Sequence, residues 1–316
     1  MTEPADHPPA GPLADGADRP ARLAVGVVGA GRVGAVLGAA LVRAGHRVVA
    51  AYAVSVASRQ RAHALLPDVP LVSPPAVFAA SDLVLLAVPD DALPGLLEGL
   101  VATDSIRAGQ IVMHTSGRFG VDVLEPATRM GALPLALHPA MTFTGTAVDL
   151  DRLGGAVFGV TAPEPLWPVA EALVVEMGAE PVRIAEGDRT LYHAALAHGA
   201  NHLVTLVNDA MDLLRAAGVA EPDRMLDPLL AAALDNVMRQ GDAALTGPVA
   251  RGDAGTVERH VAAIDRVAPE AVAAYVTLAR RTATRALASG RLRAADAEPL
   301  LDVLGGRPSQ DWNGTR

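Results

Sequence analysis

The chain has 316 residues, 51% of them hydrophobic, and a formal net charge of −9 at pH 7. That length is enough for two domains with substantial apolar cores. The absence of cysteine excludes disulfides, thiolate metal ligands and a cysteine nucleophile, and the absence of lysine excludes Schiff-base chemistry. An acidic chain without a basic cluster argues against nucleic acid or an anionic membrane as a partner.

We expect no targeting signal in the first residues. Residues 1–21 are rich in Pro, Ala, Gly and Asp, and we expect a disordered tail without a signal peptide. Residues 23–42 are apolar enough to imitate a membrane anchor, but Arg32 falls in their middle, where a charge costs about 2.5–3.5 kcal/mol on insertion scales. We therefore expect a cytoplasmic protein that does not enter a membrane.

A glycine motif follows the first apolar run, in the order Gly29-Ala-Gly31-Arg32-Val33-Gly34. In a strand–turn–helix context the first glycine permits a tight bend, the second lets the backbone approach a pyrophosphate, and the third lets the helix lie close to the strand. A Gly-rich turn of another α/β fold is the alternative. We predict that a dinucleotide binds to five residues of this motif, namely Gly29, Gly31, Arg32, Val33 and Gly34.

Apolar runs alternate with helical stretches over the first half, which predicts a doubly wound, mostly parallel Rossmann sheet in an α/β domain. Strands are expected at 23–28, 47–52, 83–88, 110–114, 133–137, 156–160 and 180–184. From residue 186 onward the pattern is helical, with helices expected at 189–217, 222–239, 256–266 and 269–289. The expected divisions are a tail at 1–21, a dinucleotide-binding domain at 22–186, an all-α domain at 187–304 and a loose tail at 305–316.

The segment after the second expected strand indicates which dinucleotide binds. The strand ends without the acidic residue that usually holds the ribose hydroxyls of NAD, and Ser55, Ser58, Arg59 and Arg61 follow. Hydroxyl and guanidinium groups suit a 2′-phosphate, although an ordinary solvated helix start has the same composition. We favour NADP over NAD, with contacts from Ser58 and Arg59.

The third expected strand ends at Val88-Pro89, which places an open loop over the far ribose of the dinucleotide. We include Val88 and Pro89 in the cofactor site. The two acidic residues that follow are interpreted as helix caps.

Two further strand ends carry polar residues. The fourth expected strand runs into His114-Thr-Ser116-Gly117, and His138 follows the fifth. Because open α/β sheets bind ligands at the carboxyl ends of their strands, Ser116, Gly117 and nearby amides are candidates to hold a substrate carboxylate. His138 is a candidate to orient a carbonyl or carry a proton, the alternative being a hydrogen-bonded structural histidine.

The first expected helix of the second domain carries a polar face. With 3.6 residues per turn, His193, Asn201 and Asn208 fall within an arc of about 80°. These groups either bond to neighbouring helices or line a cleft, with His193 as acid/base and Asn201 as a positioning group. His198 and His202 are interpreted as structural or interfacial, and no metal site is predicted because a carboxylate at ligand spacing is missing.

A segment between two later helices contains Thr246 and Arg251. Arg251 is a candidate to clamp an acidic substrate bidentately, with Thr246 adding a hydroxyl. The alternative is a helix-connecting turn with a surface ion pair.

Together these features resemble the superfamily of two-domain dehydrogenases that includes prephenate dehydrogenase, ketopantoate reductase, pyrroline-carboxylate reductase and 6-phosphogluconate dehydrogenase. Residues 22 to about 304 are similar to an actinobacterial branch of Rossmann-like proteins with a C-terminal domain of unknown function. The resemblance rests on the glycine motif and on segments beginning at His114, His138, Tyr192, Asn201 and Leu245. It implies a C-terminal domain like that of 6-phosphogluconate dehydrogenase, and a homodimer.

Two departures from the superfamily bear on activity. Ketopantoate reductase and 6-phosphogluconate dehydrogenase use a lysine of the long helix, whereas this chain has none, and His193 lies nearest the expected place. Ala194 stands where prephenate dehydrogenase has an aspartate.

The leading functional hypothesis is an NADP-dependent oxidoreductase that reduces a small 2-oxo or imino carboxylate, ketopantoate-like, between its two domains. Reduction of a carbonyl requires a proton, and without lysine or cysteine histidine is the expected donor, His193 first. An alternative is a catalytically silent NADP(H)-binding sensor or interaction protein. A third hypothesis is hydride transfer to a second cofactor such as a deazaflavin.

Overall fold

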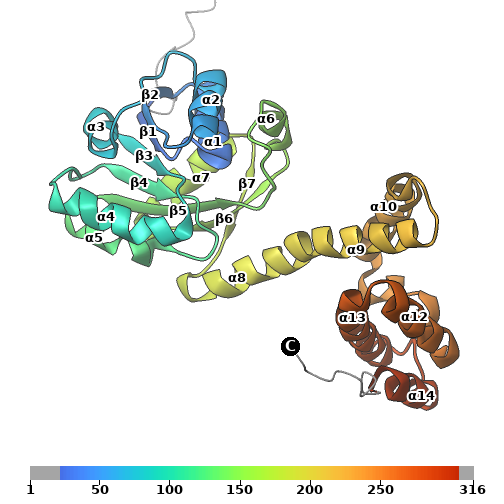
Figure 1. Ribbon diagram of the computed structural model, residues 1–316. Coiled ribbons are helices and arrows are strands. Elements are labelled where there is room, and N and C mark those ends of the chain that lie inside the picture. Colours follow the sequence, from blue (N-terminus) through green and yellow to red (C-terminus); the bar gives the residue numbers. More distant parts are fainter. Residues whose placement is uncertain (1–21, 306–316) are drawn as a thin grey trace, which may run out of the picture. The chain divides into compact units, whose positions relative to one another are not determined.

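The computed structural model describes residues 22–305, which form two compact units that divide between Ala197 and His198 (Figure 1). The tail expected at 1–21, and all but the first residue of the one expected at 305–316, lie outside the described residues. The division falls later than the boundary expected after residue 186. It places the helix that contains His193 with the sheet.

The first unit is built on a seven-stranded sheet in the order β2-β1-β3-β4-β5-β6-β7. Its strands are β1 Ala24–Val28, β2 Arg47–Tyr52, β3 Leu83–Leu86, β4 Ile111–His114, β5 Leu133–Pro139, β6 Val157–Thr161 and β7 Glu180–Arg183. All neighbours pair in parallel except β5 and β6, which are antiparallel. The expected α/β fold with a mostly parallel sheet is confirmed.

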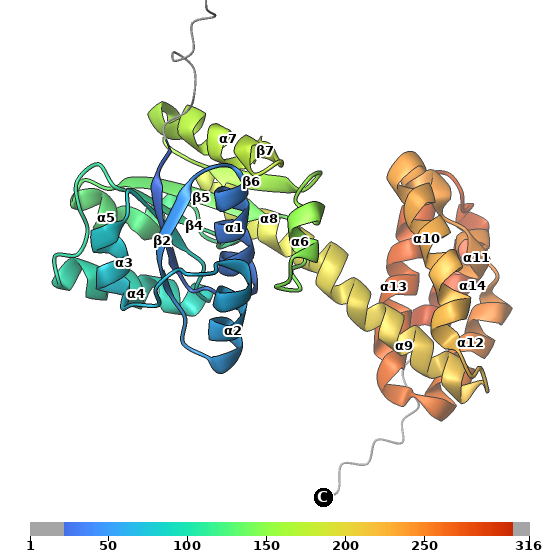
Figure 2. The ribbon, with the colours of Figure 1, turned by 90° about the horizontal axis from the view of Figure 1, so that it is seen from above.

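Helices cover both faces of the sheet because its central strands are apolar on both faces. One core joins the sheet to α1 (Arg32–Arg43), α2 (Val56–Leu65) and α7 (Trp167–Glu176). The other joins it to α3 (Pro74–Ala80), α4 (Leu93–Ala102) and α5 (Glu125–Arg129). Figure 2 shows α1 and α2 on the opposite side of the strands from α3, α4 and α5.

The strand order creates a crevice beside β1. The chain leaves β1 through α1 to β2 on one side, and returns to β3 on the other side, so β1 lies between β2 and β3. Ligands of open α/β sheets bind in the crevice at such a switch point, outside the carboxyl ends of the strands. The glycine motif begins directly after β1 and therefore lies there.

The second unit is entirely helical. Its main helices are α9 His202–Ala216, α10 Pro222–Gln240, α11 Gly247–Arg251, α12 Ala254–Val267, α13 Pro269–Ala288 and α14 Ala294–Gly305. Helices α11 to α14 share an apolar core that includes Val257, Ala283 and Leu300. The all-α C-terminal region is as expected, and the sequence reading missed α11 and α14.

The long helix expected at 189–217 is not continuous. It is α8 (Arg189–Leu196), a π-helical turn (Ala197–Asn201) and then α9. A π turn has a different hydrogen-bond period from an α-helix, so angular positions do not carry across it at 3.6 residues per turn. The arc calculated for His193, Asn201 and Asn208 was therefore wrong.

Among residues 22–305, every helix is either too short or too polar to cross a membrane.

Candidate cofactor and active site

The three glycines of the motif have three different environments. Gly29 has φ +93°, and a Cβ there would lie 2.5 Å from the carbonyl oxygen of Ala87. A Cβ at Gly34 would overlap the carbonyl oxygen of Gly29 and lie 2.9 Å from the Cβ of Ala87. At Gly31 the nearest such atom is 3.9 Å away. The outer glycines thus serve the bend and the helix packing, and Gly31 leaves open backbone.

Helix α1 begins at this open backbone. Gly31 is its N-cap, no side chain caps the first turn, and the turn contains no acidic residue. Unpaired N–H groups at a helix start attract anions. Arg32 is exposed and Val33 half-buried at the same turn. The residues present therefore fit a bound pyrophosphate.

The start of α2 differs from expectation at Ser58. Its side chain is buried, and its hydroxyl lies 2.9 Å from the carbonyl oxygen of Ser55 and 3.0 Å from the Ser55 hydroxyl. Ser58 is therefore occupied within the helix cap. Arg59 is exposed and donates one hydrogen bond to the carbonyl of Val54 at 2.7 Å. Its other N–H groups have no hydrogen-bond partner among residues 22–305 and can bind a ligand.

A second arginine of α2 lies beside the loop that follows β5. A Cβ at Gly145 would lie 2.8 Å from Cδ and Nε of Arg61 and 3.0 Å from Cγ of Arg32. Neither arginine forms an ion pair with a described residue. Two unpaired guanidinium groups next to a glycine backbone are suited to phosphate.

The end of β3 packs on the glycine turn, since a Cβ at Gly29 would lie 3.1 Å from Cγ1 of Val88. Val88 is half-buried and Pro89, at the start of a 3₁₀ turn (Asp90–Ala92), is exposed. Both thus lie at the mouth of the crevice.

His114 shapes the loop after β4. Its ring is fully buried, with Nε2 2.8 Å from the carbonyl oxygen of Gly120 and Nδ1 accepting from the amide of Ser116 at 3.2 Å. Burial lowers the pKa of His114 to about 4, so the ring is neutral. The Ser116 hydroxyl accepts from the amide of Phe119 at 3.2 Å. His114 and Ser116 thus hold the turn that presents Gly117.

The structure brings His138 and His193 together at Gly117. Their ring centroids lie 5.7 Å apart. A Cβ at Gly117 would lie 2.5 Å from Cδ2 of His193 and 3.0 Å from Nε2 of His138. His138 is part of β5, one residue beyond the expected strand end, and His193 is in α8. His193 was expected in the helical domain, whereas both histidines belong to the first unit.

Tyr192 completes this cluster. Its hydroxyl lies 2.8 Å from Nδ1 of His138. Gly159 of β6 pairs with His138 across the sheet, and a Cβ at Gly159 would lie 2.5 Å from the Tyr192 hydroxyl. The missing side chain therefore makes the room that the phenol occupies.

Arg189 anchors α8 to the sheet. Its side chain is 1% exposed and donates to the Thr161 hydroxyl at 2.7 Å, and to the carbonyls of Ala136 at 2.7 Å and Gly159 at 3.1 Å. Its remaining terminal nitrogen has no partner among the described residues, and no carboxylate forms an ion pair with it. Burial lowers the pKa of Arg189 to about 10, which leaves it charged at neutral pH.

This charge acts on the neighbouring ring. Burial first, and then the nearby His193, Arg189 and His114, lower the pKa of His138 to about 4. Burial raises the pKa of Tyr192. At neutral pH both groups are uncharged. Because the unprotonated nitrogen of a neutral imidazole is a better acceptor than a phenol oxygen, we assign the phenol as the donor to Nδ1, which leaves the ring hydrogen on Nε2.

Sequence reasoning missed Tyr192 and Arg189. A usable signal was present, because positions 189, 192 and 193 follow the i, i+3, i+4 spacing that puts side chains on one face of a helix. This spacing shows that the three side chains share one helix face. It does not show that the face packs on β5 and β6, because no local sequence pattern specifies that contact.

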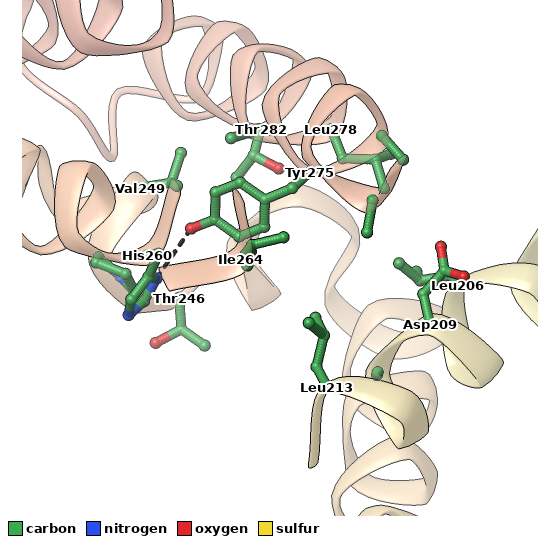
Figure 3. Close-up of a pocket in the computed structure, with 15 residues that line it drawn as sticks. Leu206, Asp209, Leu213, Thr246, Val249, His260, Ile264, Tyr275, Leu278 and Thr282 are labelled. Carbon is green, nitrogen blue, oxygen red and sulfur yellow. Dashed lines mark hydrogen bonds between the residues drawn. The ribbon is translucent and has the colours of Figure 1, made fainter. Parts of the chain in front are cut away.

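The other candidates belong to the second unit. Asn201 is exposed at the end of the π turn, and Thr246 and Arg251 are exposed at either end of α11. Thr246 is one of the residues that line a cavity of about 460 Å³ between α9, α11, α12 and α13. In Figure 3, His260 and Tyr275, joined by a 2.9 Å hydrogen bond, face this cavity from one side, and Leu206 and Asp209 of α9 from the other.

His198 and His202 are both exposed, with their Nδ1 atoms 3.0 Å apart. Within residues 22–305, no group of three or more His, Asp or Glu side chains is arranged to hold a metal ion.

Comparisons with known proteins agree with this architecture. The Rossmann-like domain model matches residues 9–139, and the model of a domain of unknown function, DUF2520, matches residues 156–282. No protein of curated function matches the chain.

Solved structures share the fold at low identity. A "putative NADP oxidoreductase" from Bacteroides fragilis is 20% identical with a TM-score of 0.70, over 83% of this chain and 98% of that one. A reductive aminase from Aspergillus terreus, in complex with NADPH and ethyl levulinate, is 20% identical with a TM-score of 0.61, over 86% and 95%. An imine reductase from Pseudomonas sp. is 18% identical with a TM-score of 0.59, over 84% and 94%.

The glycine turn, the strand order and the two matching models lead to one assignment: this chain consists of a Rossmann-like domain followed by a DUF2520 domain.

Proposed function

We propose that the protein is an NADP-dependent reductase of a small 2-oxo or imino carboxylate. The observation that carries this proposal is the placement of His138, His193 and Gly117 together at the carboxyl edge of a sheet whose first turn fits a pyrophosphate. Structural neighbours described as NADP oxidoreductase, imine reductase and reductive aminase support the reaction class.

The residues that would hold the cofactor form two groups. Gly29, Gly31 and Gly34 with the start of α1 would bind the pyrophosphate, with Val88 and Pro89 at the mouth of the crevice. Arg59 and Arg61 would bind the 2′-phosphate of NADP, and the buried Ser58 would hold the helix cap behind them. When bound, the reduced nicotinamide supplies a hydride.

The protein's own part is to hold the substrate and manage a proton. His193 would deliver the proton, as a histidine positioned next to the reacting group can. His138 would hold the reacting oxygen or nitrogen. Ser116 and Gly117 would shape the floor of the site. The roles of Asn201, Thr246 and Arg251, which belong to the helical unit, stay predictions from the sequence.

The test is a binding and turnover experiment on the whole protein. Calorimetric titration with NADPH and NADH should show tighter NADPH binding, and NADPH oxidation is then followed with a panel of 2-oxo acids and cyclic imino acids. Replacing His193 with Ala should lower turnover by roughly two to four orders of magnitude and leave NADPH affinity near wild type. Unchanged turnover in this variant would shift the proton-donor role to His138.

The second candidate function is a silent NADP(H) sensor or interaction protein. The exposed apolar side chains of α9 and α10 favour a binding surface of some kind. Tight NADPH binding without oxidation by any member of the panel would support this function over the reductase.

A further inference from the structure

We infer that the substrate is a carbonyl compound rather than an imine, with its oxygen bound to Nε2–H of His138, whose ring Tyr192 and Arg189 hold in place. This inference rests on the proposed reductase function and narrows its substrate class.

The first step is the orientation of the His138 ring. Tyr192 occupies Nδ1 at 2.8 Å, and the two rings meet edge to face with centroids 5.5 Å apart. Nε2 has no hydrogen-bond partner among the described residues. Within residues 22–305, the one side-chain nitrogen or oxygen that is both buried and without a partner belongs to Arg189, so Nε2 of His138 is accessible to solvent. The nitrogen Nε2 of the ring is therefore available to a ligand.

The second step is the charge of the neighbourhood. The groups around His138 are Arg189, His193 and His114, and each of them disfavours a further positive charge. The nearest acid on the same segment, Glu186, accepts hydrogen bonds from the backbone amides of Val121 at 2.7 Å and Asp122 at 3.4 Å. Its charge is therefore shared with a neighbouring turn, and it forms no ion pair with Arg189.

The third step compares the two substrate classes in this environment. Reducing a carbonyl develops negative charge on oxygen, which a preorganised N–H donor and a buried cation stabilise. An imine is reduced as its protonated form, which has no acceptor for Nε2–H and which a buried, unpaired guanidinium repels. The arrangement favours the carbonyl on both counts.

Tyr192 is then a positioning residue. Its hydroxyl contacts His138, and we assign to this contact the choice of which ring nitrogen carries the hydrogen. Removing the hydroxyl frees the ring to adopt the other tautomer or to turn, in which case Nε2 no longer donates reliably.

The chain contains a matched control. The hydroxyl of Tyr275 is likewise hydrogen-bonded to Nδ1 of a histidine, His260, at 2.9 Å, but in the helical unit (Figure 3). Tyr192→Phe and Tyr275→Phe therefore remove the same chemical contact from two different places. A general loss of stability from a missing phenol would appear in both variants.

The experiment measures structure, binding and turnover on the full chain. Nitrogen-15 NMR of ¹⁵N-histidine-labelled protein should show His138 as the Nε2–H tautomer in the wild type and in Tyr275→Phe, and a changed signal in Tyr192→Phe. Oxamate, a carboxylate with a carbonyl oxygen, should bind the NADPH complex more tightly than proline, a cyclic secondary amine. Tyr192→Phe should weaken oxamate binding about tenfold with NADPH affinity unchanged.

Turnover of pyruvate-type 2-oxo acids should exceed that of a five-membered cyclic imino acid at least tenfold, with Tyr192→Phe lowering kcat more than it raises KM. Preferential reduction of the imine would overturn this inference and leave the proposed reductase standing. If no compound is reduced, the reductase proposal fails, and the oxamate and proline titrations then decide whether the site prefers a carbonyl. A Tyr192→Phe variant with an unchanged His138 signal and unchanged oxamate affinity would also overturn it.

Discussion

The hydroxyl of Tyr192 lies 2.8 Å from Nδ1 of His138, across a separation of 54 residues in the chain. This contact exists because α8 docks on β5 and β6 through the buried side chain of Arg189. The catalytic candidates of the first unit are therefore placed by one helix–sheet junction.

Arg189→Met should destabilise the protein by about 2–4 kcal/mol, because three hydrogen bonds to buried acceptors are lost. The methionine side chain fills the space of the apolar part of the arginine, so the loss reports the hydrogen bonds. Chemical denaturation measures the free energy of unfolding. The control is Arg183→Met, an exposed arginine that pairs with Glu164, for which we expect a loss below about 1 kcal/mol. Equal effects of the two substitutions would contradict the anchoring role of Arg189.

Gly31→Ala should lower NADPH affinity, whereas Gly34→Ala should lower the stability of the fold. Gly31 has open space for a Cβ and φ −79°, so its alanine variant should fold normally and lose NADPH affinity. At Gly34 the Cβ would overlap the backbone of Gly29, so that variant should fold poorly or with a clearly lowered melting temperature. Gly99→Ala, in α4 with nothing within 4 Å, is the control and should be slightly stabilising. Thermal melts and NADPH titrations distinguish the three.

Arg59→Asp should weaken NADPH binding more than NADH binding, because it replaces a phosphate donor with a repelling carboxylate. Both affinities are measured by calorimetry. Arg129→Asp on α5, whose arginine pairs with Glu125 on the surface, should leave both affinities unchanged. Equal or reversed preference for the two dinucleotides in the wild type would refute the assignment of NADP.

The pH dependence of stability should report the buried histidines. An unfolded histidine titrates near 6.5, whereas His114 in the folded protein has a pKa of about 4. The unfolded chain thus binds the proton first, and stability is lost as the pH falls from 6.5 toward 4, by about 3 kcal/mol for this one group. His138 contributes in the same direction.

Denaturation at a series of pH values checks this dependence. His114→Asn should be less stable than the wild type at pH 7.5 and show a shallower decline below pH 6.5. His63→Asn, which changes an exposed histidine of α2, should keep the wild-type slope. A wild-type slope in the His114 variant would show that this ring does not govern the acid sensitivity.

A homodimer formed through the helical unit is expected. Helix α9 has no buried residue and α10 only Pro222, while Val204, Leu229, Leu234 and Met238 are 61%, 62%, 56% and 80% exposed. That much apolar surface indicates an interface. Light scattering should give twice the chain mass, and Leu234→Arg should shift the protein toward monomer. A stable wild-type monomer at micromolar concentration would refute this expectation.

The sequence alone determined the sheet, because its apolar runs are long and separated by strong turn signals. The strand expected at 47–52 has those bounds in the structure, and the others agree within two residues at each end. The role of the glycine motif could also be predicted from the sequence. The positive φ at Gly29 and the close backbone contact at Gly34 both arise within a single turn.

The tertiary structure decided the site. Ser58 was expected to bind a phosphate, but its side chain is buried and its hydroxyl is hydrogen-bonded to Ser55 at the start of α2. The sequence alone does not show which serine hydroxyl of this helix start faces the solvent. The polar face expected along one long helix is interrupted by the π turn at 197–201. Arg189 and Tyr192 act through contacts with β5 and β6, which lie more than 25 residues earlier in the chain. A period along the sequence specifies which side chains share a face, and only the packing of that face decides what they touch.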